Sequence, residues 1–382
     1  MANNNDNKVL NVPHLRFPEF SGEWKMCTIG ELTTKVGSGV TPRGGEAVYK
    51  TEGHPFVRSQ NVGLGNLLLD DIAFIDEETH LRQKSTELQF NDVLLNITGA
   101  SIGRSALVDK QIVGGNVNQH VCIIRTKENL VPSFICSFLL SNYGQRQIDS
   151  FQAGGNRQGL NFEQIKSIKI TIPSKDEQIK IAKLLRAIDE RIATQNKIID
   201  KLQSLIKGIA QNIARNNKPN IRLSECLKCS SSTLQESDVC KNGTYPVYGA
   251  NGIVGYLDNY NTEKEAVYII KDGSGVGTVS YITGKCSATG TLNTLQAKEG
   301  YSLQYLYYML KVFNFEPYKT GMAIPHIYFK DYGKAKIFCP SYTEQLKYAR
   351  LLSAIDNKLS AEQSILTDLS LQKQYLLRQM FI

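Results

Sequence analysis

One helical passage occurs twice in this chain. The segment "PSKDEQIKIAKLLRAID" begins at Pro173, and "PSYTEQLKYARLLSAID" begins at Pro340, which sets a spacing of 167 residues. Besides the proline, ten positions of the two passages are identical, and Phe162 lies 167 residues before Phe329, so the register extends upstream. A repeat this long is typical of a duplicated domain and not of a solenoid unit. We therefore expect two copies of one structural unit.

Each passage begins a long amphipathic helix. Ser174 with Glu177, and Ser341 with Glu344, fit a capping box, in which hydroxyl and carboxylate bind backbone donors of the first helical turn. Apolar residues then recur every seven positions, as in a coiled-coil seam. A helix from 174 to 213 would be about 60 Å long. The predicted seam comprises Leu185, Ile188, Ile192, Ile199, Leu202 and Ile206 in the first copy, and Leu352, Ile355, Leu359, Leu366 and Leu369 in the second.

Such a seam requires a partner helix, and the duplicate is the obvious one. Gln195 and Glu362 fall at equivalent places in the two patterns, where a polar pair would help to fix the register. The alternative is two amphipathic helices buried in separate globular cores. The seam runs over roughly four heptads, longer than an average globular helix, and this favours the paired arrangement.

The segments before each long helix are similar to diverged copies of one α/β domain. In order, each has an amphipathic opening, a strand ending in a glycine turn, an asparagine-bearing strand, a helix and a glycine-containing loop. The linker 216–220 is polar and contains a proline. The expected organisation is an N-terminal segment (1–22), a first domain (23–162), a central helical segment (163–218), a second domain (219–332) and a distal helical segment (333–382).

Charge is concentrated on the repeated helices. The net charge of +8 makes nucleic acid a plausible partner. Residues 163–218 carry 12 Lys and Arg against 6 Asp and Glu, whereas 23–162 carry 13 against 14 and 221–335 carry 11 against 10. The scattered basic residues of the first long helix admit three readings: a solvated face, contacts to phosphates, or a docking surface for a partner.

Composition indicates a soluble, cytoplasmic protein. Hydrophobic residues make up 41% of the chain, no apolar run is long enough to cross a bilayer, and the N-terminus lacks the pattern of a secretory signal. The eight cysteines are scattered, and in a chain of 382 residues they indicate free thiols in a reducing compartment.

Motifs for catalysis and for cofactors are missing from the sequence. There is no "NPPY"-like stretch of an adenine methyltransferase and no glycine loop ending in Gly-Lys-Ser/Thr. The glycine-rich "DGSGVGTVS" at 272–280 is predicted to form a hairpin turn and not a cofactor loop. Cys226 and Cys229 form a single CxxC without the paired spacing of a zinc site, so no metal is predicted. We expect neither catalytic residues nor a cofactor in this chain.

The chain resembles the specificity subunit of type I restriction–modification systems. The resemblance rests on the paired "EQ.K.A.LL.AID" helices, "LRFPEF..EW" at 15–24, "YGANG" at 248–252 and "IPHIYFKDY" at 324–332. It implies a duplicated α/β (α+β) fold in which two target-recognition domains each read one half of a split DNA site. The two long helices would form an antiparallel coiled coil in a pseudo-twofold arrangement. A separate hypothesis is that the N-terminal segment packs beside the C-terminal helix and completes the pseudo-twofold ring.

The same resemblance implies the partners. Double-stranded DNA would be bound at a bipartite site, and two methyltransferase (modification) subunits would dock on the paired helices. The methyltransferases would supply S-adenosylmethionine, while motor-nuclease subunits would supply ATP- and Mg-dependent cleavage. Two alternatives are a stand-alone DNA-binding regulator and a coiled-coil scaffold that binds no DNA. A third alternative is an enzyme, and the missing catalytic motifs argue against it.

DNA readout requires side chains that pair with base edges: Arg or Lys with guanine, Asn or Gln with adenine. Polar loops that contain glycine allow close approach to the duplex. The candidates for DNA contact are Arg43, Arg58, Gln60, Asn61, Asn156, Arg157 and Gln158 in the first domain, and Asn251, Lys271, Lys319, His326 and Tyr328 in the second. For each residue taken singly, a solvated turn is the simpler reading.

Overall fold

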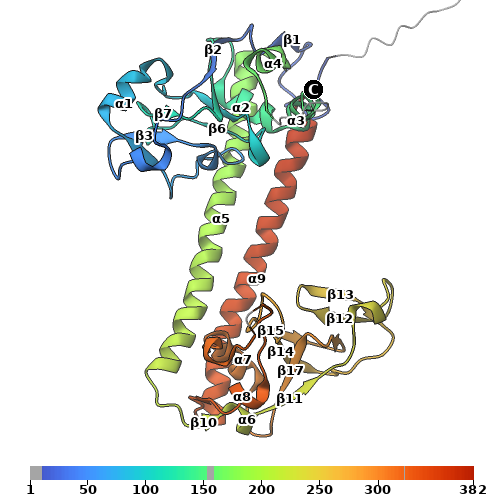
Figure 1. The fold of residues 1–382 in the computed structure, drawn as a ribbon. Coiled ribbons are helices and arrows are strands. Elements are labelled where there is room, and N and C mark those ends of the chain that lie inside the picture. The colour runs from blue at the N-terminus through green and yellow to red at the C-terminus, as the bar shows by residue number, and fades with distance from the viewer. Residues whose placement is uncertain (1–10, 153–158, 322) are drawn as a thin grey trace, which may run out of the picture. The chain divides into compact units, whose positions relative to one another are not determined.

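The computed structural model describes residues 11–152, 159–321 and 323–382. The chain forms two compact units. The first comprises the chain up to Thr194 together with Leu366–Ile382, and the second comprises Gln195–Ile365. The long helices α5 (Lys175–Arg215) and α9 (Tyr342–Gln379) each contribute one end to each unit (Figure 1). Each unit therefore consists of one domain of strands and short helices with a pair of long-helix segments.

The first unit contains short strands and helices before α5. They are β1 (Lys25–Thr28), β2 (Thr33–Ser38), η1 (Gly45–Val48), β3 (His54–Val57), η2 (Ser59–Asn61), β4 (Ala73–Ile75), α1 (Glu77–Arg82), η3 (Lys84–Thr86), β5 (Val93–Asn96), η4 (Gly99–Ser101), β6 (Ser105–Leu107), β7 (Asn116–Val117), β8 (Val121–Thr126), α2 (Pro132–Leu140), α3 (Asn142–Ser150), α4 (Phe162–Ser167) and β9 (Lys169–Ile172), where η denotes a 3-10 helix.

The second unit contains a corresponding series before α9. It runs through β10 (Ile221–Arg222), α6 (Leu223–Cys226), β11 (Leu227–Ser231), η5 (Glu236–Asp238), β12 (Tyr245–Gly249), β13 (Gly252–Leu257), β14 (Glu265–Ile270), β15 (Val279–Thr283), β16 (Ser287–Ala288), β17 (Leu292–Ala297), α7 (Leu303–Lys311), η6 (Glu316–Tyr318), α8 (Phe329–Tyr332) and β18 (Lys336–Ile337).

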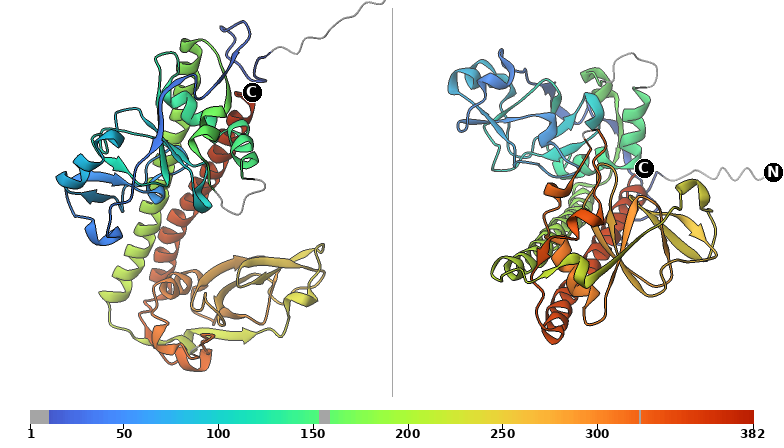
Figure 2. Two further views of the ribbon diagram at one scale, coloured as in Figure 1. Left: turned by 45° about the horizontal axis from the view of Figure 1, so that its top comes forward. Right: turned by 60° about the horizontal axis from the view of Figure 1, so that its bottom comes forward.

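Sheet topology confirms the predicted duplication. In the first domain the strand orders are β2-β8-β5-β6 and β4-β3-β7, and in the second they are β11-β17-β14-β15 and β13-β12-β16. The same positions carry the parallel pairs β3–β7 and β12–β16, and a two-stranded antiparallel pair, β1–β9 or β10–β18, joins the start of each domain to its end. The β12–β13 hairpin is drawn in yellow in Figure 2. The glycine-rich segment 272–280 joins β14 to β15 as the predicted hairpin.

The largest core of the first unit joins the domain to both helices. Phe134 and Phe138 of α2 pack with Phe381 at the end of the chain, with ring centroids 5.2 and 6.1 Å from that of Phe381. Leu185 of α5 and Leu377 of α9 belong to the same buried cluster. The first turns of α5 therefore lie at the last turns of α9, so the two helices are antiparallel in this unit.

Every position of the predicted seam is buried or half-buried. In the second unit, Gln195 Nε2 donates to the main-chain oxygen of Glu362 at 3.0 Å and also to its carboxylate. In the first unit, Lys373 occupies a seam position where the other copy has Ile206. Its Nζ lies 2.5 Å from Asp189 Oδ1 and 3.1 Å from the Leu64 carbonyl oxygen. Lys373 thus ties α9 to a loop of the first domain.

The capping boxes form only in part. Glu177 N–H donates to Ser174 Oγ at 3.4 Å, but the Glu177 carboxylate binds Arg16 at 2.7 and 2.8 Å. In the second copy, the Glu344 carboxylate accepts bonds from Ser341 N–H at 3.3 Å and from its hydroxyl at 2.7 Å. The prediction of a complete capping box at the first helix is wrong, because Arg16 forms a bidentate, charge-assisted contact with the Glu177 carboxylate that the box would need.

A buried glutamine performs the same task at both helix starts. Gln178 Nε2 donates to the carbonyl oxygens of Pro173 and Asn129, both at 3.1 Å, and its Oε1 accepts from Val131 N–H at 2.9 Å. Gln345 Nε2 donates to Pro340 at 2.9 Å, and its Oε1 accepts from Ser302 N–H at 2.9 Å. Val131 and Ser302 are the N-cap residues of α2 and α7. We call these two contacts the glutamine clamps.

From residue 11 on, the N-terminal segment packs beside the C-terminal helix, as hypothesised. Leu15 N–H donates to the carbonyl oxygen of Gln379, at the end of α9, at 2.9 Å. Phe17 packs against the core that contains Phe381, and Trp24 is buried beside Phe134 with ring centroids 6.0 Å apart. Residues 11–24 therefore lie on both helix ends of the first unit.

We predict that Gln345→Ala destabilises the second unit by about 1–3 kcal/mol, because Ser302 N–H and the Pro340 carbonyl lose a buried partner. Gln374→Ala, at an exposed position of the same helix, is the control and should change stability by less than about 0.5 kcal/mol. Urea unfolding followed by circular dichroism measures both. Equal stability of the two variants would show that the clamp carries no net energy.

Candidate nucleic-acid interface

The candidates of the second domain gather around two loops joined by their backbones. Gly273 N–H donates to Pro325, and Ile327 N–H donates to Lys271, both at 2.9 Å. Asp272 and His326 form an isolated β-bridge, and Thr320 pairs with His326 in the same way. The turn after β14 and the loop before α8 therefore form one surface, which brings Lys271, Lys319, His326 and Tyr328 together.

This surface combines cations with an exposed aromatic ring. The His326 ring meets Tyr328 edge to face with centroids 5.1 Å apart, and Lys330 Nζ lies 5.1 Å from the Tyr328 centroid. Tyr328 is 46% exposed. Lys319 is already paired with Glu316 at 2.6 Å. Lys330 and Tyr328 offer a cation and a ring face, the groups that bind phosphates and stack on bases.

Asn251 lies elsewhere in the second domain. It is exposed in the turn between β12 and β13, which together with β16 form the three-stranded sheet. An exposed amide at a hairpin tip can approach a duplex groove, so Asn251 stays a predicted contact.

The first domain repeats the two-loop arrangement. Thr98, after β5, forms an isolated β-bridge with Gly159, and Leu160 N–H donates to Ile97 at 2.8 Å. Gly159 lies 167 residues before His326, so the two bridges are equivalent. The loop that ends at Gly159 carries the candidates Asn156, Arg157 and Gln158, which lie outside the described residues.

Sequence reasoning missed a polar chain beside this bridge. Thr41 N–H donates to Gln119 Oε1 at 3.0 Å, so the Gln119 amide nitrogen faces His120 Nε2, also at 3.0 Å. His120 Nε2 must then accept, and Nδ1–H donates to Thr98 Oγ1 at 2.6 Å. Arg43, two residues after Thr41, is exposed. Consecutive Asn118, Gln119 and His120 in a turn between strands were the available signal.

The three candidates around η2 differ in how far their side chains are used inside the domain. Arg58 Nη2 binds Asp71 Oδ1 at 2.8 Å, and the guanidinium carbon lies 5.4 Å from the Tyr49 ring centroid. Asn61 is buried: its Oδ1 accepts from Arg58 N–H at 3.0 Å and its Nδ2 donates to Leu68 at 2.9 Å. Gln60 also binds Asp71 but is exposed. Gln60 is therefore the most accessible of the three.

Cys226 and Cys229 are buried or half-buried thiols. Burial raises the pKa of Cys226 to about 12 and that of Cys229 to about 11, which keeps both thiols protonated at neutral pH. Among the residues that the structure describes, no group of three or more His, Cys, Asp or Glu side chains could hold a metal ion.

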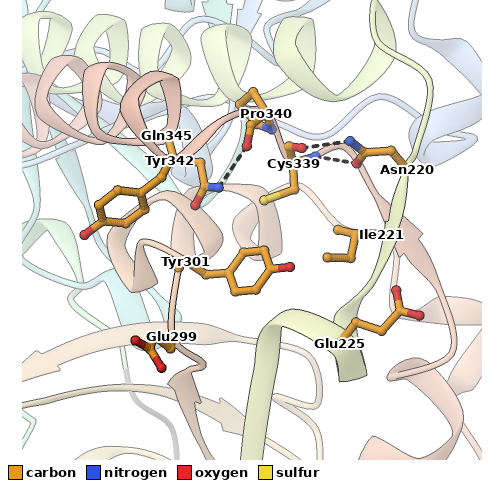
Figure 3. Close-up of a pocket in the computed structure, with 10 residues that line it drawn as sticks. Asn220, Ile221, Glu225, Glu299, Tyr301, Cys339, Pro340, Tyr342 and Gln345 are labelled. Carbon is orange, nitrogen blue, oxygen red and sulfur yellow. Dashed lines mark hydrogen bonds between the residues drawn. The ribbon is translucent and has the colours of Figure 1, made fainter.

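A surface pocket of about 550 Å³ lies where α9 begins (Figure 3). Its lining includes Gln345, whose Nε2 binds Pro340, and Asn220, whose side chain binds both N–H and C=O of Cys339 at 2.8 Å. Glu225 also lines it, and its carboxylate accepts from Arg222 N–H at 2.9 Å. These polar groups serve the fold, joining the linker to α9.

Within the described ranges 11–152, 159–321 and 323–382, no helix is long and apolar enough to cross a membrane.

Comparison with known proteins agrees with this duplicated architecture. The type I restriction modification DNA specificity domain matches residues 21–204 and, a second time, residues 220–370. The chain belongs to this family. It is a non-catalytic DNA-recognition subunit of a type I restriction–modification system.

Two relatives illustrate the extent of the likeness. A protein named as a type I specificity subunit of Mycoplasma genitalium is 25% identical over 320 residues, which cover 76% of this chain and 81% of that protein. The EcoKI specificity subunit of Escherichia coli K12 is 22% identical over 202 residues, which cover 50% of this chain and 41% of that subunit.

Two solved structures share the fold of the specificity subunit. The crystal structure of the S subunit from M. genitalium matches with a TM-score of 0.67 at 19% identity, over 97% of this chain and 99% of that chain. A second structure comes from work on complex assembly and conformational transition of the type I R-M system. It matches with a TM-score of 0.54 at 16% identity, over 93% of this chain and 96% of that chain.

Asn61→Ala should destabilise the first unit by about 1–3 kcal/mol, because it leaves Arg58 N–H and the Leu68 carbonyl without a buried partner. Gln60→Ala, one residue away and exposed, should leave stability within about 0.5 kcal/mol. Thermal unfolding of the two variants distinguishes these roles. Unchanged stability of the Asn61→Ala protein would show that these two bonds carry no net energy.

Proposed function

We propose that the chain recognises a bipartite DNA site, with one half-site read by the paired loops of each domain. The proposal is carried by one observation: equivalent bridges, Thr98–Gly159 and Asp272–His326, hold loops of unlike sequence at the same place in the fold. A constant scaffold with different polar side chains suits the recognition of two different sequences. Because the two domains carry almost no net charge, we expect this chain alone to bind DNA with modest affinity and partner subunits to add to the affinity of the assembly.

The outer faces of α5 and α9 are the proposed docking surfaces for two methyltransferase subunits. Exposed apolar residues occur on both helices beside the excess of basic charge, and exposed apolar side chains that gather on one surface often mark protein interfaces. The proposed docking surfaces include Ile198, Leu205, Ile365, Leu371 and Tyr375. The methyltransferases would bring S-adenosylmethionine, and motor-nuclease subunits would bring ATP and Mg. The assembly would act in the cytoplasm, where both DNA and cofactors are found.

The experiment is co-expression of this chain with its methyltransferase subunit in a methylation-free host, followed by single-molecule sequencing for N6-methyladenine. The expected result is methylation at one split motif, which disappears when this chain is omitted. Methylation that persists without the chain, or that shows no motif, would contradict the proposal.

A variant control separates recognition from assembly. Lys271→Ala and Tyr328→Ala together should weaken methylation while the methyltransferase still co-purifies, because both side chains lie on the loop surface and not on the long helices. Loss of co-purification in this variant would indicate that these loops bind protein.

A further inference from the structure

The repeated helices keep the same residues on one face but differ in what covers it. On α5 this face consists of Glu177, Lys180, Ile181 and Leu184, at helical spacings of three, four and seven. The equivalent face of α9 consists of Glu344, Lys347, Tyr348 and Leu351, and three of its four residues are identical to their counterparts. We call this second set the α9 stripe.

In the first unit the face is covered by the N-terminal segment. Arg16 binds both carboxylate oxygens of Glu177, at 2.7 and 2.8 Å, and donates to the carbonyls of Gly22 and Ser21 at 2.6 and 3.0 Å. Glu177 is 1% exposed as a result. A buried carboxylate is tolerated here because a bidentate guanidinium neutralises it.

The aromatic residues next to Arg16 complete the cover. Lys180 Nζ lies 4.5 Å from the centroid of Phe17 and 6.0 Å from that of Phe20, and it also pairs with Glu19. Leu184 is half-buried in the core that Phe17 joins. One short segment thus supplies an arginine for the glutamate and rings for the lysine, and its Phe17 packs against the same core as Leu184.

In the second unit the same face is open. Glu344 and Lys347 are exposed, Leu351 is 51% exposed, and Tyr348 is half-buried against Tyr305 with centroids 6.2 Å apart. The Glu344 carboxylate turns back to Ser341. The linker cannot substitute for the N-terminal segment, since only residues 216–220 connect α5 to β10, and Asn220 is bound to Cys339.

We propose that the α9 stripe binds a segment of a partner subunit that carries an arginine followed closely by aromatic residues. The occupant is inferred from charge complementarity and from the chain's own segment seated on the identical residues of α5. This inference rests on the proposed function, in which the chain assembles with other subunits. The new element is that the start of α5 is covered by the chain's own N-terminal segment, whereas the start of α9, beside the second domain, is covered by a partner.

The first test uses a fluorescent peptide with the sequence of residues 12–23, titrated into the full chain without DNA. Saturable binding is expected, at least tenfold weaker for the variants Glu344→Gln and Leu351→Ala and for an Arg16→Ala peptide. Leu371→Ala, which changes an equally exposed leucine of α9 outside the stripe, is the matched control and should bind as the wild type does. The tethered N-terminal segment keeps its own site occupied through its high effective concentration. Binding that is absent, or equal in all variants, overturns the proposal.

The second test asks whether the occupant is a partner. In the co-expressed complex, Leu351→Ala should lower the amount of partner that co-purifies. Leu81→Ala, which changes an exposed leucine of α1 outside every proposed docking surface, provides the comparison. An unchanged amount overturns the proposal even if the peptide binds. If the chain alone forms dimers that Leu351→Ala abolishes, the occupant is a second copy and the partner assignment is wrong. Because peptide binding needs no DNA, it fails or succeeds independently of the methylation experiment.

Discussion

The architecture depends on a buried amide at the start of each long helix. Gln178 and Gln345 use both ends of their side chains, binding the carbonyl of the preceding proline and the N–H at the start of α2 or α7. These groups lie at helix starts, where backbone donors have no partner within the helix. The amide satisfies them and, with the same bonds, fixes the recognition domain to the helix. The clamp therefore sets the direction in which each helix leaves its domain.

Around this constant clamp the two copies diverge in a consistent way. Asp189 and Asp356 are equivalent, yet the first binds Lys373 and the second accepts a bond from the Tyr308 hydroxyl at 3.2 Å. The helix sequence is retained while its partners change, because the recognition domains differ. The same logic applies to the loops: the bridges Thr98–Gly159 and Asp272–His326 are equivalent, and the side chains around them are not. Shared geometry with different surface chemistry is what reading two unlike half-sites requires.

The sequence predicted the duplication and the long helices because both are periodic signals. It could not predict that Arg16 would take the carboxylate of Glu177 out of its capping box, since the two residues lie 161 positions apart. Arg58 and Asn61 looked like free loop side chains, but Asp71 and Leu68 engage them through a local turn. Gln119 and His120 were missed because their hydrogen bonds to Thr41 and Thr98 are tertiary, and the run of polar residues at 118–120 was the only trace of them in the sequence. Asn156, Arg157 and Gln158 stay predictions.

The central claim is that each domain reads its own half-site. The most direct measurement is the methylated motif of two variants co-expressed with the methyltransferase: Gln119→Ala in the first domain and Lys271→Ala in the second. The account predicts that each substitution relaxes base preference in one half of the motif and leaves the other half unchanged, because base-edge contacts act position by position. Relaxation of both halves by either substitution would contradict separate readout.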